Sequence, residues 1–143
     1  MNWREHLQVR LLDVQPASVY ALDEAAHHLA ASVLPTASVY LPDRPLDAPC
    51  TLALGIDALN RLDAPHALHL LNRTRLYAAP RILLATQHTG PLDAEAFRAL
   101  GFMLSTDDIN AQVRVYAYDL DTYKTVPDWL NARYWAHPER WEP

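Results

Sequence analysis

The stretch "VYALDEAAHHLA", residues 19–30, decides the fold. A short apolar, partly β-branched run leads directly into alanines and leucines at helical spacing, and Asp23 stands where the first helical turn needs a cap. A strand running into a helix is the repeating unit of α/β proteins, and the turn between the two faces the ligand in such folds. The stretch contains no glycine, the residue that lets a backbone approach a ligand closely.

The same alternation continues along the chain. Residues 3–11, 24–34, 66–78 and 94–100 show helical spacing, and strand patterns occupy 17–22, 37–41, 50–56 and 81–86. In the first helix, Trp3, Leu7 and Leu11 form one apolar stripe. Asp63 and Asp93 are predicted caps of the last two helices, and Gly101 is predicted to end the last one in a left-handed conformation. Two further strands, "FMLS" (102–105) and "VRVYAYDL" (113–120), are predicted as an edge pair, with "STDD" (105–108) in the turn between them. We therefore predict one α/β domain over residues 1–143 with a three-layer, mostly parallel, Rossmann-like sheet, an antiparallel edge hairpin and an aromatic tail over 125–143.

Composition narrows the class of protein. Twelve Lys and Arg residues oppose 17 Asp and Glu residues, a net charge of -5, and this balance indicates no basic face for nucleic acid. The one cysteine, Cys50, cannot form an internal disulfide, and the charged N-terminal stretch does not resemble a signal peptide. We expect a cytoplasmic protein that binds neither nucleic acid nor membrane.

Four segments of the second half together resemble a known family. They are "CTLALGIDALNRL" (50–62), "ALHLLNRTRLYAAPRILLATQ" (67–87), "LDAEAFRALGF" (92–102) and "VRVYAYDL" (113–120). Their order is similar to that of the second half of a class I S-adenosylmethionine (SAM)-dependent methyltransferase. The resemblance implies a SAM cleft at the carboxyl ends of the strands.

The first half departs from that family. Where the family has a glycine-rich turn, this chain has Leu22-Asp23-Glu24-Ala25, and its first glycine is Gly55. Asp23 and Glu24 would repel the carboxylate of the cofactor. Asp43 is the nearest match to the acidic residue that binds the ribose, and Asp57 stands alone where the family has its catalytic-loop signature.

The connection "PDRPLDAPC" (42–50) is short. A parallel crossover takes a dozen residues or more, so the family's third strand and its helices are predicted to be missing. We therefore expect a shortened sheet that lacks one wall of the adenosine pocket, which makes this a truncated, degenerate relative.

Other polar residues have both a functional and a structural interpretation. Asp57 and His88 are the candidates for acid–base chemistry at the carboxyl edge, and Asp23, Glu24 and Asp43 are the candidates for cofactor binding, but acids at loop ends are commonly helix caps. His66 and His69 share a helical face and are weak candidates for a metal site, and no further ligand motif accompanies them. Histidines on a helix surface are the favoured interpretation.

The C-terminal tail is rich in aromatic residues, namely Trp129, Tyr134, Trp135 and Trp141. Such residues are typical of an interface with a second chain or of packing onto the body of the protein. Stacking on RNA bases is the weaker interpretation, because acidic residues are interspersed with the basic ones.

These observations favour a non-catalytic, methyltransferase-like scaffold or interaction protein without a cofactor, which forms a homodimer or binds another protein. The alternative is a small-molecule-binding protein, or a SAM-dependent methyltransferase, that uses the strand-end cleft. Fold resemblance alone does not decide between them.

Overall fold

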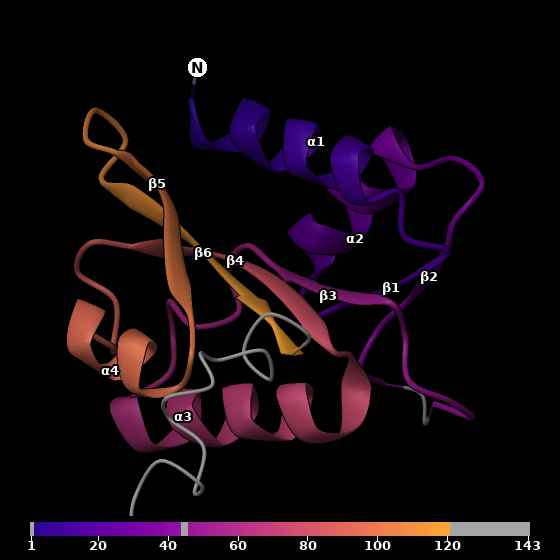
Figure 1. Ribbon diagram of the computed structural model, residues 1–143. Helices are drawn as coiled ribbons and strands as arrows, with labels where there is room; N and C mark the ends of the chain where they lie inside the picture. The colour runs from indigo at the N-terminus through magenta and orange to yellow at the C-terminus, as the bar shows by residue number, and fades with distance from the viewer. Residues whose placement is uncertain (1, 44–45, 121–143) are drawn as a thin grey trace, which may run out of the picture.

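A computed structural model describes residues 2–43 and 46–120, and it consists of one six-stranded sheet with helices on both faces (Figure 1). The strand order is β2-β1-β3-β4-β6-β5. The strands are β1 (Ser18–Ala21), β2 (Ser38–Tyr40), β3 (Leu52–Gly55), β4 (Arg81–Gln87), β5 (Met103–Asp108) and β6 (Val113–Asp119). The first four are parallel, whereas β6 is antiparallel to both β4 and β5. The predicted fold class is confirmed.

The helices begin at side-chain caps. They are α1 (Trp3–Val14), α2 (Glu24–Val33), α3 (Ala64–Arg73) and α4 (Ala94–Ala99), and a π-helical turn, η1 (Thr74–Ala78), extends α3. Asn2 and Glu5 form a capping box at α1, and the predicted caps Asp23, Asp63 and Asp93 each accept a backbone N–H in the first turn. Gly101 follows α4 with φ 93°, as the left-handed end predicted for this helix requires.

Two cores lie on opposite faces of the sheet. The helices α1 and α2 cover one face, where Leu7 and Leu11 pack against alternate side chains of β1 and β3. The helices α3 and α4 cover the other face (Figure 1), where the ring of Phe97 stacks on that of Tyr116 at 4.0 Å between centroids. The sheet is therefore the middle layer of three.

The turn predicted at "STDD" is wrong. Residues 105–108 belong to β5, and the chain turns at 109–112, where Asp108 Oδ1 accepts the N–H of Ala111 and Gln112 takes φ 57°. Ser, Thr and Asp favour turns locally, but here the pairing of β5 with β6 overrides that preference. A bulge between Leu104 and Thr106 accommodates the extra residue. Of the two hairpin strands only β5 lies at a sheet edge, because β6 is between β4 and β5.

The sheet ends at β2. The chain passes from β2 to β3, which lies on the far side of β1, and the described residues of this link, 41–43 and 46–51, form neither helix nor strand. The link therefore covers little of the sheet. Among the described helices, none is both long and apolar enough to cross a lipid bilayer.

Candidate functional site

Asp23 occupies the junction between the ends of β1 and β3. One carboxylate oxygen, Oδ1, accepts the N–H of Ala26 at 2.8 Å and caps α2. The other oxygen, Oδ2, accepts the N–H groups of Ile56 at 2.8 Å and Asp57 at 2.9 Å, just past the end of β3. Asp23 thus holds together two segments that are more than thirty residues apart in the sequence.

This junction is the position where α/β folds of this kind bind ligands. Helix N-termini and backbone N–H groups at the carboxyl ends of parallel strands attract anionic groups. In this chain the anion is the side chain of Asp23 itself. Glu24, in the first turn of α2, adds a second exposed carboxylate beside it.

Asn60 extends this polar network toward β4. Its Nδ2 donates to Oδ1 of Asp57 at 3.3 Å, and its Oδ1 accepts the N–H of Gln87 at 3.4 Å. Both distances are long, so each bond is weak. Sequence analysis missed Asn60, whose only signal was its place in the loop after β3.

His88 is directed to the β5–β6 hairpin. Its Nε2 lies 2.6 Å from Oδ1 of Asp107, and its backbone N–H donates to the carbonyl of Gln112 at 2.8 Å. Arg114 Nε donates to the other oxygen of Asp107 at 3.2 Å. The hydrogen bond from His88, with that from Arg114, lowers the pKa of Asp107. The structure therefore brings Asp57 to Asp23 but places His88 in an ion-pair cluster with Asp107.

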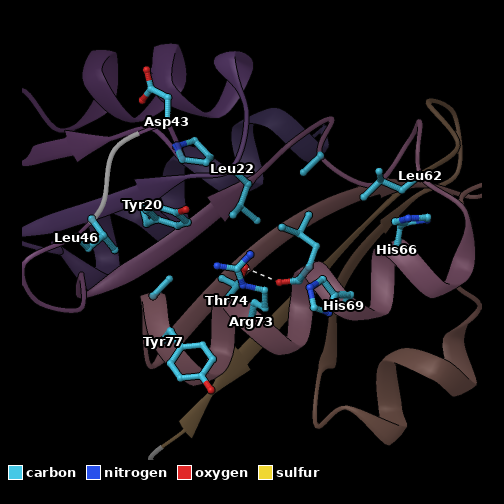
Figure 2. Close-up of a pocket in the computed structure, with 14 residues that line it drawn as sticks. Tyr20, Leu22, Asp43, Leu46, Leu62, His66, His69, Arg73, Thr74 and Tyr77 are labelled. Atoms are coloured by element: carbon cyan, nitrogen blue, oxygen red, sulfur yellow. Dashed lines mark hydrogen bonds between the residues drawn. The ribbon is translucent and has the colours of Figure 1, made fainter.

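A groove of about 830 Å³ runs beside α3 (Figure 2), and we call it the α3 groove. Tyr20 of β1 and Leu22, just after that strand, form its floor. One wall is the side of α3 and η1 from His66 to Tyr77, and the other is the link after β2, through Pro42, Asp43 and Leu46. Burial raises the pKa of Tyr20.

Three residues singled out in the sequence line this groove, namely Asp43, His66 and His69. Sequence analysis missed Tyr20, Arg73 and Tyr77, and the signal that could have found them is the short link after β2. In Figure 2 Thr74 Oγ1 donates to the carbonyl of Leu70 at 2.7 Å, so this hydroxyl is bound to its own helix.

The histidine pair is not arranged as a metal site. His66 Nδ1 lies 2.6 Å from Oδ1 of Asp63, the residue that caps α3, and both side chains are exposed. In residues 2–43 and 46–120, no three His, Cys, Asp or Glu residues gather closely enough to hold a metal ion. The predicted interface residues Trp129, Tyr134, Trp135 and Trp141 lie outside the described residues.

Comparison with solved structures shows methyltransferase folds. A magnesium protoporphyrin IX methyltransferase from Synechocystis, solved with bound SAM, matches 80% of this chain and 76% of its own length, at a TM-score of 0.55 and 11% identity. A TehB-like SAM-dependent methyltransferase from Corynebacterium glutamicum matches 78% of this chain and 86% of its own, at a TM-score of 0.48 and 13% identity. At 11% identity the likeness to the Synechocystis enzyme establishes the fold alone, and it confirms the predicted methyltransferase-like architecture.

A search of curated proteins finds no match to this sequence. One family model covers the whole of residues 1–143. The chain belongs to that family, DUF6231, a family of unknown function.

Proposed function

We propose that this protein is a non-catalytic, methyltransferase-like interaction protein. The observation that carries the proposal is the set of three backbone N–H groups bound by the carboxylate of Asp23. In related architectures these are the donors that an anionic ligand group would use. A cofactor carboxylate would have to displace Asp23 and would meet the negative charge of Glu24.

The interaction role is supported by exposed apolar side chains. Leu76 and Tyr77 on η1 are 66% and 71% exposed. Large apolar side chains gathered at a surface are typical of contact sites for proteins. Self-association as a homodimer, or binding of another protein, is the role that we assign to the protein on this ground. The single cysteine suits the reducing cytoplasm.

Calorimetric titration with SAM and with S-adenosylhomocysteine tests the proposal. We expect no heat of binding from the unsubstituted protein. Binding in the micromolar range would contradict the proposal. The variant Asp23→Gly frees the three N–H groups and restores the glycine that the family has in this turn, so binding that appears only in this variant identifies Asp23 as the group that blocks the site.

Asp93→Gly is the matched control. Asp93 also caps a helix, because its carboxylate accepts the N–H of Ala96, but it lies on α4, away from the β1–β3 junction. A loss of stability that both variants share results from removal of a helix cap. A change in SAM binding that occurs only in Asp23→Gly results from the freed N–H groups at the β1–β3 junction.

A second function, small-molecule binding with SAM as the first candidate, is favoured by the α3 groove. Its volume of about 830 Å³ lies in the range of small-molecule sites. Asp43 lies at its mouth, shortly after the end of β2, where the family resemblance implies a ribose-binding acid. Native mass spectrometry of the purified protein checks this function: an added small-molecule mass supports it, and the mass of the bare chain counts against it.

A further inference from the structure

The α3 groove exists because part of the sheet has no covering helix. Tyr20 and Tyr40 are register partners on the parallel strands β1 and β2, so their side chains project from the same face. Tyr40 is 42% exposed, although α3 and α4 cover the rest of this face. Among its described residues, the link after β2 contributes Leu46 and Cys50 to the neighbouring core.

The last described residue, Leu120, lies near one end of this groove. The N–H of Leu120 donates to the carbonyl of Pro80 at 2.8 Å, and its side chain packs in the core under α3. Pro80 comes three residues after Tyr77, which lines the groove. Figure 1 shows the end of β6 above α3. The described part of the chain therefore ends, at Leu120, near the η1 end of the groove.

We propose that the α3 groove is the docking site for the chain's own residues 121–143, with Trp129 and Trp135 as the apolar anchors. The proposal goes beyond the proposed function, because it assigns the groove, with Tyr77, to the chain's own tail and leaves the exposed side chain of Leu76 to a partner. The SAM titration reports on the Asp23 junction and the experiment below reports on the groove, so failure of one is distinguishable from failure of the other.

The segment has the necessary length. Trp129 is nine residues beyond Leu120, so an extended chain carries it up to about 30 Å. The ten residues of α3 span about 15 Å. Both Trp129 and the residues after it can therefore reach any point along the groove.

The chemistry of the segment matches the groove. Residues 121–143 contain three of the four tryptophans of the chain, and their three Lys and Arg residues against four Asp and Glu residues give 3 − 4 = −1. His69 and Arg73 project along the groove wall, where an Arg side chain packs favourably on an indole ring. A tethered segment also has a higher effective concentration at the groove than a second molecule.

Quenching of a fluorescent label by tryptophan tests the proposal on the full chain. A bimane label attached to the cysteine of Tyr77→Cys loses fluorescence when a tryptophan lies in the groove. Native Cys50 is only 3% exposed, and the unsubstituted protein shows whether it takes up any label. We expect quenched emission that does not depend on protein concentration. We also expect the emission to recover in the double variant Trp129→Leu, Trp135→Leu.

A label on Ser32→Cys is the matched control, because Ser32 is exposed on α2, across the sheet from the groove. The tail substitutions should leave its emission unchanged. The proposal is overturned if the Tyr77→Cys label shows no tail-dependent quenching. It is also overturned if quenching grows with concentration, a result that assigns the groove to a second copy of the chain.

Discussion

The carboxyl edge of the sheet and the α3 groove differ in how the chain has filled them. At the edge, Asp23 binds the N–H groups that a ligand would use, and Asn60 continues the polar network toward β4. In the groove, the short link after β2 leaves Tyr20 and Tyr40 without a covering helix. The comparison shows that the chain's own carboxylate ties the carboxyl edge of the sheet together, whereas the face beside α3 keeps a groove.

The largest expected effect concerns the closed edge. Asp23→Ala removes the cap of α2 and the oxygen that accepts the N–H groups of both Ile56 and Asp57, so we expect the free energy of unfolding to fall by about 2–4 kcal/mol. Asp93→Ala, which removes a single cap bond, should cost about 1 kcal/mol. Urea denaturation of both variants measures the difference. Equal losses would mean that Asp23 is only a cap.

A smaller effect is expected at Gly55, the last residue of β3. A Cβ atom there would lie 2.7 Å from Cδ1 of Leu84, which is fully buried, and 3.1 Å from Cδ1 of Leu22. Gly55→Ala should therefore cost about 1–3 kcal/mol through overpacking. Thermal and urea unfolding check this loss, with Ser32→Ala on the exposed surface of α2 as the control. An unchanged midpoint would show that the edge is loosely packed.

The hairpin cluster at the same edge predicts a modest dependence of stability on pH. The hydrogen bonds from His88 and Arg114 lower the pKa of Asp107 in the folded state. The ionised Asp107 carboxylate therefore stabilises the folded state fully above the unfolded pKa, which is about 3.9 for an aspartate. This stabilisation is lost as the pH falls through the lower pKa of the folded state. Asp107→Asn should show less acid destabilisation than the unsubstituted protein when denaturation midpoints are compared from pH 7 to pH 3. If the two proteins lost stability equally as the pH falls, the pKa of Asp107 would not contribute to acid destabilisation.

The smallest effect is expected in the groove wall. His69 is exposed, so His69→Ala should change the free energy of unfolding by less than about 0.5 kcal/mol. Zinc should leave the melting temperature of the unsubstituted protein unchanged. A zinc-dependent rise that His69→Ala abolishes would instead reveal a metal site on α3.

Local signals in the sequence predicted the helices well. Asp23, Asp63 and Asp93 were identified as caps because a cap bonds to an N–H only three residues away. The buried stripe of Leu7 and Leu11 followed from helical spacing for the same local reason.

Long-range pairing was harder to predict. The residues "STDD" have turn preferences, yet Asp107 lies opposite Arg114 in the β5–β6 ladder. The second role of Asp23 escaped prediction as well, because its partners Ile56 and Asp57 come from another strand end.

The sequence by itself determined the order of strands and helices, the helix starts and the loss of the crossover after β2, because these depend on spacing along the chain. Only the tertiary structure decided that Asp23 closes the strand-end junction and that Tyr20, Arg73 and Tyr77 border an open groove. Both depend on which strand ends and helix faces become neighbours in the folded sheet, and that proximity joins residues more than thirty positions apart.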